Sequence, residues 1–106
     1  MSSEAVALAN PKLDEASHPI LPRYARMHFD KTRDRWMLLV PERVMVPDET
    51  AIEILQLCDG VRSLGDIIDH LAQKFVAERE AIAGDVISML QDLADKGFLI
   101  DATVED

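Results

Sequence analysis

Polar and apolar residues alternate in the first half of the chain as they do in half-buried strands. Residues 25–29 follow a period of two, which predicts an extended segment. Two further segments, at 35–40 and 42–46, are rich in β-forming residues and are separated by Pro41 and closed by Pro47. The pattern therefore predicts a three-stranded antiparallel meander.

In the second half of the chain the apolar residues recur with the period of a helix. Asp48 is placed to cap a first helix, for which Gly60 supplies the stop. Ser63, followed three residues later by an acid, is placed to cap a second helix. A third helix is expected from about residue 79 to residue 96, with Gly97 as its stop. Three consecutive helices are therefore expected.

This order of elements predicts an α+β fold, a winged helix-turn-helix-like three-helix domain with an N-terminal three-stranded antiparallel sheet. The chain of 106 residues fits one domain, and a short extended segment at 98–100 completes it. Residues 1–19 mix small and polar residues without a clear apolar face, which is typical of a flexible tail or linker. A short helix that forms on contact with a partner is the alternative for this tail. Residues 20–106 are expected to form the domain.

The charge balance argues against nucleic acid and membranes as partners. Twenty acids against eleven bases give a net charge of −9, which repels phosphate backbones and anionic lipids. The second and third helices resemble a DNA-reading pair, but residues 79–96 hold two bases against four acids. No apolar run approaches the roughly 20 residues that cross a bilayer. Residues 1–8 carry an acid where a secretion signal carries a base, so we expect a cytoplasmic protein.

No constellation of residues indicates catalysis or cofactor binding. The three histidines, at positions 18, 28 and 70, have no second ligand at metal-binding spacing, and the glycines form no phosphate-binding loop. Cys58 lies in an apolar helical stretch, which favours a buried hydrophobic role, with an intermolecular disulfide as the alternative. We therefore expect a chain that binds and is not an enzyme, without metal or cofactor.

The informative feature is the expected edge strand at 42–46. Val44 and Val46 point to one side and Met45 to the other, so both faces are apolar. Edge strands normally carry charges or bulges that block further pairing, but here Pro41 and Pro47 bracket the strand and leave Arg43 to Val46 free to pair. Such an edge favours β-augmentation, in which a partner peptide adds a strand. The alternative is that the third helix or the tail covers it.

Several segments together carry a resemblance to a known family. In chain order they are Leu21-Pro22-Arg23, the strand end at 38–42, the string from Ile54 to Gly60, the helix start from Ser63 to Ile67, Asp85-Val86 with Leu90 and Leu93, and Gly97 to Ile100. In order and spacing they resemble the PqqD family over residues 20–100. The resemblance implies a small non-enzymatic protein of pyrroloquinoline quinone biosynthesis. Such a protein binds the ribosomally made precursor peptide PqqA and presents it to PqqE, a radical S-adenosylmethionine enzyme.

The resemblance also implies where the peptide binds, as an added strand between the third strand and the third helix. Carried onto this sequence, the groove is walled by Arg43, Val44, Met45 and Val46 on the strand and by Ile82, Asp85, Val86 and Met89 on the helix. Two functions from other classes remain as alternatives. One is a winged-helix transcription regulator, and the other is a structural subunit that dimerises through the same apolar edge.

Overall fold

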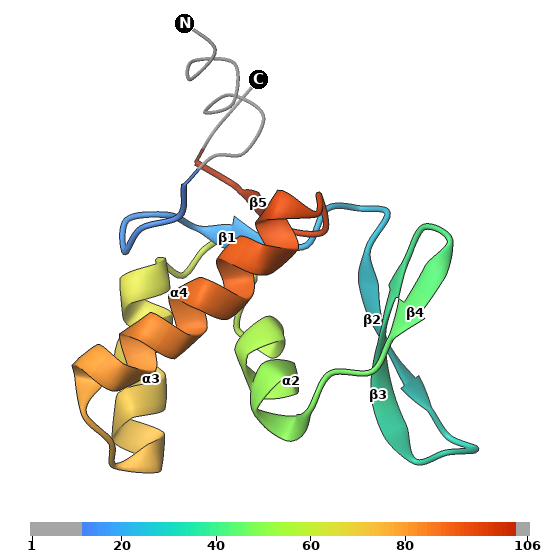
Figure 1. The fold of residues 1–106 in the computed structure, drawn as a ribbon, viewed down its shortest axis with the longest axis horizontal. Coiled ribbons are helices and arrows are strands. Elements are labelled where there is room, and N and C mark those ends of the chain that lie inside the picture. Colours follow the sequence, from blue (N-terminus) through green and yellow to red (C-terminus); the bar gives the residue numbers. More distant parts are fainter. Residues whose placement is uncertain (1–11, 104–106) are drawn as a thin grey trace, which may run out of the picture.

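The computed structural model describes residues 12–103 and arranges them as helices beside two small sheets (Figure 1). The strands are β1 (Pro19–Ile20), β2 (Arg26–Asp30), β3 (Arg35–Val40), β4 (Arg43–Met45) and β5 (Ile100–Asp101), and the helices are α2 (Glu49–Gln56), α3 (Leu64–Phe75) and α4 (Arg79–Asp95). The expected order of three strands followed by three helices is confirmed, and the fold is α+β.

The three-stranded sheet is an antiparallel meander in the order β2-β3-β4. Leu38 of β3 lies opposite both Met27 of β2 and Met45 of β4, and residues directly opposite each other share a face. Leu38 is almost completely buried, so this face points inward. Figure 1 shows the three helices on one side of the sheet. Within residues 12–103, β4 pairs with β3 alone and is therefore an edge strand, as the sequence predicts.

Side-chain caps begin two of the helices where they were expected. The Asp48 carboxylate accepts a hydrogen bond from the Ala51 amide at 2.8 Å, and the Ser63 hydroxyl accepts one from the Asp66 amide at 3.1 Å. α4 ends just before Gly97, whose φ of 84° provides the expected left-handed stop. Local sequence therefore sets these helix ends.

Gly60 is not the stop of the first helix, which is a correction to the sequence-based expectation. α2 already ends at Gln56, four residues earlier. Gly60 instead has a φ of 80°, and its amide donates to the Pro19 carbonyl at 3.0 Å. A Cβ at this position would lie 2.9 Å from the Ile20 side chain. The glycine is thus required where the loop after α2 approaches β1.

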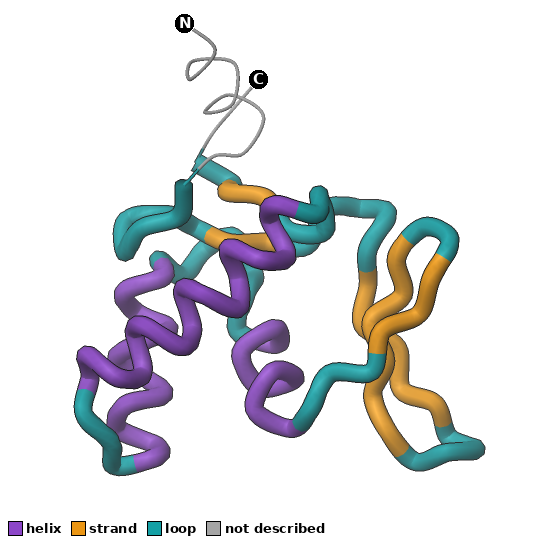
Figure 2. Tube along the Cα trace, in the orientation of Figure 1, coloured by secondary structure: helices purple, strands orange, loops and turns teal. Residues whose placement is uncertain are grey.

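Residues 12–19 belong to the domain, so the expected tail over residues 1–19 is wrong for this part. The Leu13 side chain is only 7% exposed within the core, and its amide donates to the Gln91 side-chain oxygen at 2.8 Å. Pro19 pairs with Asp101, so β1 and β5 form a two-stranded sheet of their own (Figure 2). The pairing gives the extended segment at the C-terminal end its partner. Residues 1–11 lie outside the described part of the chain.

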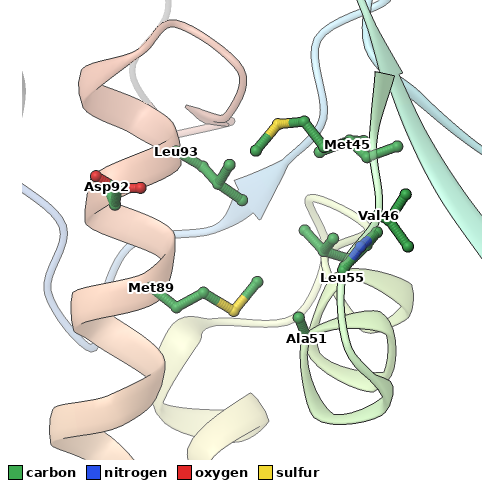
Figure 3. Close-up of a pocket in the computed structure, with 9 residues that line it drawn as sticks. Met45, Val46, Ala51, Leu55, Met89, Asp92 and Leu93 are labelled. Carbon is green, nitrogen blue, oxygen red and sulfur yellow. The ribbon is translucent and has the colours of Figure 1, made fainter. Parts of the chain in front are cut away.

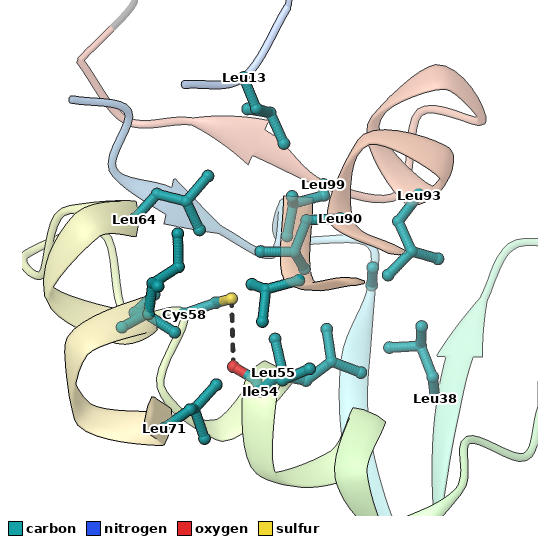
Figure 4. Packing of buried hydrophobic residues seen from close by; sticks show 14 of the residues in the cluster. Leu13, Leu38, Ile54, Leu55, Cys58, Leu64, Leu71, Leu90, Leu93 and Leu99 are labelled. Atoms are coloured by element: carbon teal, nitrogen blue, oxygen red, sulfur yellow. Dashed lines mark hydrogen bonds between the residues drawn. The ribbon is translucent and has the colours of Figure 1, made fainter. Parts of the chain in front are cut away.

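The core lies between the helices and the inward face of the meander (Figure 4). α3 contributes Leu64, Ile67, Ile68 and Leu71, and α4 contributes Val86, Leu90 and Leu93. Cys58 is also buried there, and its thiol donates to the Ile54 carbonyl at 3.3 Å. The expectation that Cys58 is a small buried hydrophobe is confirmed.

Candidate functional site

An apolar cavity of about 230 Å³ lies beside the free edge of the meander. Its walls come from the meander, from Val46 and Pro47 directly after β4, and from the helices α2 and α4 (Figure 3). The lining residues are Leu38, Met45, Val46, Pro47, Ala51, Leu55, Met89, Asp92 and Leu93. Asp92 is the only charged residue among them, and it is paired with Lys96 at 3.0 Å. The cavity therefore suits apolar side chains.

Helix and strand periodicity bring the lining residues together. Met89 and Leu93 are four residues apart on α4 and share one face of that helix. Met45 reaches the cavity from the inward face of β4, and Leu55 reaches it from α2. Figure 3 shows Met45 and Met89 extending into the cavity from opposite sides. Methionine side chains repack easily, so these walls can adapt to guests of different shape.

The backbone of β4 offers hydrogen-bonding groups next to this cavity. The loop between β3 and β4 has two residues, so Val40 and Arg43, which flank it, form a hydrogen-bonded pair. Hydrogen-bonded and non-hydrogen-bonded pairs alternate along an antiparallel ladder. The next pair, Leu39 with Val44, is therefore non-hydrogen-bonded, and the Val44 N–H and C=O point to the open edge. A further strand can pair there.

The structure brings three of the eight residues expected at the peptide site to the cavity. Met45, Val46 and Met89 line it. Arg43 and Val44 lie beside it on β4 and are exposed, Val44 by 57%. The Arg43 guanidinium lies 5.8 Å from the centre of the Phe98 ring, which is a cation–π distance. Arg43 thus connects the edge strand to the segment after α4.

The other three expected residues lie on the first half of α4, away from the cavity lining. Val86 is 2% exposed and belongs to the core. Ile82 is half-buried against that core, and Asp85 is exposed. The second half of α4 faces β4 instead, through Met89, Asp92 and Leu93. In the sequence, the spacing of four residues between Met89 and Leu93 is the signal that both lie on one face of this helix.

The α2 wall of the cavity was also absent from the sequence-based site. Ala51 and Leu55 lie on the apolar face of α2, and nothing in the sequence separates a residue that faces a cavity from one that faces the core. Leu38 was expected on the sheet but was not assigned to the site. The candidate site is therefore a pocket lined by β3, β4, α2 and α4 beside an open edge, and it involves more elements than a groove between one strand and one helix.

The part of the chain that the structure describes holds no cluster of three or more histidine, cysteine, aspartate or glutamate side chains suited to a metal ion.

Burial raises the pKa of the Cys58 thiol to about 12, with the neighbouring Asp59 carboxylate adding to the effect. Within residues 12–103 no helix is long and apolar enough to span a membrane.

Comparison with known proteins identifies the family. A family model described as Coenzyme PQQ synthesis protein D (PqqD) matches residues 35–99. The chain belongs to the PqqD family. The matched region begins with β3 and ends just after α4, so it contains every element that lines the cavity.

Relatives of similar length extend the match over most of the chain. A PqqA binding protein from Bradyrhizobium diazoefficiens is 58% identical over 98 residues, which cover 90% of this chain and 95% of the relative. A PqqA binding protein from Rhodopseudomonas palustris strain BisB5 is 59% identical over 97 residues, with coverages of 92% and 95%.

A solved structure shows the same fold. It is the solution structure of the PqqD truncation of Methylobacterium extorquens PqqCD, a functional and stand-alone RiPP recognition element. It is 35% identical to this chain, superposes with a TM-score of 0.70 and covers 83% of this chain and 94% of its own. The α+β arrangement of the PqqD family is thereby confirmed for this chain.

Proposed function

We propose that this chain is a peptide chaperone that binds the precursor peptide PqqA. The peptide adds as a strand to the open edge of β4, where the Val44 backbone supplies the first donor and acceptor. Alternate peptide side chains enter the apolar cavity between β4, α2 and α4. The observation that carries the proposal is this open edge lying directly beside an apolar cavity. The names of the relatives from Bradyrhizobium and Rhodopseudomonas support PqqA as the peptide.

The chaperone presents the bound peptide to the radical S-adenosylmethionine enzyme PqqE. It contributes binding alone and is not an enzyme, because Asp92, the one charged residue that lines the cavity, is paired with Lys96, and the other lining residues are apolar. Its effect is to raise the local concentration of the peptide and to fix its orientation toward the enzyme. We place this activity in the cytoplasm, where the precursor peptide is made.

The test is a titration of the ¹⁵N-labelled chain with synthetic PqqA, followed through its amide resonances. We expect the largest shifts at Val44 and Met45 on the edge and at Met89 and Leu93 on the facing helix. A peptide of the same composition in scrambled order is the control. Shifts confined to α3, or the same response to the scrambled peptide, would contradict the proposed site.

Two measurements separate this function from the alternatives of other classes. A winged-helix regulator would retain labelled duplex DNA at about 50 mM salt, where phosphate contacts are strongest. A dimerisation subunit would show a mass that rises with concentration in light scattering and would lose its partner when peptide is added. We expect neither result.

A further inference from the structure

The basic residues of the two halves of the molecule differ in whether they are paired. Each base after residue 47 forms an ion pair, namely Arg62 with Asp59, Lys74 with Glu53, Arg79 with Glu15 and Asp69, and Lys96 with Asp92. By contrast, Arg23, Arg26 and Arg35 form no ion pair with any residue between 12 and 103. All three are exposed. The helical part therefore pairs each of its cations, whereas the sheet pairs Arg33 with Asp30 and leaves these three arginines without an ion pair in the described part of the chain.

This difference makes the sheet the positive end of an acidic molecule. Residues 23–46 hold six bases and three acids, a net charge of +3. Since the whole chain carries −9, the remaining residues carry −12. An acidic partner is attracted to the sheet and repelled by the helices, and the attraction weakens with salt.

The unpaired arginines surround one face of the meander. The register places Arg26, Leu39 and Val44 in one row across the sheet and His28 and Met37 in the next. Asp30 and Arg35 form the third row, and these seven residues define the outer face. It is the face opposite Met27, Leu38 and Met45, which pack against or within the core. Figure 1 shows the helices on the other side of the sheet.

A hollow of about 340 Å³ extends this outer face toward the β3–β4 turn. Its lining includes Arg23, Tyr24, Arg26 and Leu39. Apolar side chains in the centre with arginine and tyrosine around them are the composition enriched at protein–protein interfaces. A phosphate backbone requires the cations alone, so the apolar centre favours a folded protein partner.

We propose that the outer face is the docking surface for a folded protein whose own surface carries carboxylates around an apolar patch. The inference rests on the proposed function in one respect, namely that this partner is the enzyme that modifies the bound peptide. The peptide occupies the open edge of β4 and the cavity on the inward side, and the enzyme contacts the opposite face. Both therefore bind the same small sheet at the same time.

Charge reversal on the outer face tests the proposal. Arg26→Glu is titrated separately with PqqA peptide and with PqqE, and Arg35→Glu is a second variant on the same face. Lys12→Glu is the matched control, because Lys12 is an exposed base that lies beside α4. We expect each arginine variant to bind the enzyme about tenfold more weakly, with a smaller salt dependence. Peptide affinity should stay within about twofold, which also shows that the variants are folded, and Lys12→Glu should bind both partners normally.

Four results would overturn the docking surface. They are unchanged enzyme binding by both arginine variants, an equal loss in Lys12→Glu, a parallel loss of peptide binding, or light scattering in which the arginine variants abolish a self-association of the wild type. Wild-type chain that binds peptide but no enzyme would overturn both the docking surface and presentation of the peptide. Wild-type chain that binds the enzyme but no peptide would contradict the proposed function. In that case the arginine variants would still decide whether the enzyme docks on the outer face.

Discussion

At the scale of single residues, burial decides what Cys58 can do. The side chain is 7% exposed, and its thiol donates to the Ile54 carbonyl at 3.3 Å. Because burial and the Asp59 charge raise the pKa to about 12, the sulfur stays protonated at neutral pH and is a poor nucleophile. A buried sulfur is also badly placed for the intermolecular disulfide that the sequence left open. Its role is to fill the core.

Replacing Cys58 with alanine should therefore affect stability and spare function. The small cavity left behind should lower the free energy of unfolding by about 1 kcal/mol, measured by urea denaturation. PqqA affinity and modification of the bound peptide by PqqE should stay unchanged. A folded variant that binds peptide yet supports no modification of it by PqqE would instead assign the thiol a chemical role.

The Asp101 carboxylate links the residue before β1 to the segment after β5. Partial burial opposes its ionisation, but hydrogen bonds from the Thr103 hydroxyl and from the His18 and Thr103 amides outweigh this effect and lower its pKa below 3.8. A lowered folded-state pKa means that the charged form stabilises the fold. The contribution of Asp101 to the free energy of unfolding is complete at a pH above its unfolded-state pKa. It is lost as the pH falls through its folded-state pKa.

An Asp101→Asn variant should accordingly show a weaker loss of stability on acidification. We expect the difference in unfolding free energy between variant and wild type to be largest near neutral pH and to shrink below about pH 4. Urea midpoints at pH 7 and pH 3 measure it. A difference that is the same at both pH values would show that the carboxylate charge contributes nothing.

At the scale of elements, β4 combines a short length with a free edge. Only Arg43–Met45 pair with β3, and the Val44 amide points away from that partner. The Met45 amide belongs to the next hydrogen-bonded pair, opposite Leu38, and points inward. Neighbouring residues of one strand thus have opposite roles, one available to a peptide and one needed by the fold.

Proline substitution separates the two roles, because proline has no amide to donate. Val44→Pro should weaken PqqA binding by about tenfold or more while the circular dichroism and thermal midpoint change little, since edge strands tolerate proline. Calorimetric titration measures the binding. Unchanged affinity in the folded variant would refute strand addition at β4.

Met45→Pro is the matched control one residue further along. It removes a donor that the β3–β4 ladder uses, so stability itself should fall by about 1–3 kcal/mol. The two variants should therefore differ in what they lose. Equal destabilisation would show that the assignment of the outward-facing amide is wrong.

At the scale of the whole molecule, the segment before β1 holds distant parts of the chain together. Leu13 enters the core, and Glu15 accepts hydrogen bonds from Arg79 at the start of α4. The Arg79 hydrogen bonds lower the pKa of Glu15, although this pair is exposed and screened by solvent. The apolar contact is therefore the stronger tie.

Leu13→Ala tests whether this segment stabilises the fold. Truncating a buried leucine costs about 2–4 kcal/mol, and the thermal midpoint should fall accordingly. Lys12→Ala changes the adjacent exposed residue and should stay within about 0.5 kcal/mol of the wild type. If the two variants were equally stable, residues 12–19 would not stabilise the fold and would be a tail, as the sequence suggested.

The sequence by itself determined the features that depend on neighbours along the chain. The period of two before Pro41, the caps at Asp48 and Ser63 and the stop at Gly97 are local, because each arises from hydrogen bonds or side-chain positions within a few residues. The edge strand was also predictable, because a meander of three strands leaves its last strand unpaired on one side. The family resemblance rests on the same local segments.

Tertiary structure decided what depends on contacts between distant segments. Leu13 looked like part of a tail because the core residues that bury it lie far from it along the chain. Gly60 looked like a helix stop because the approach of Ile20 is invisible in the sequence. The cavity lies at Met89 and Leu93, and Val86 is in the core, because the packing of α3 against α4 sets which part of one apolar stripe faces the sheet.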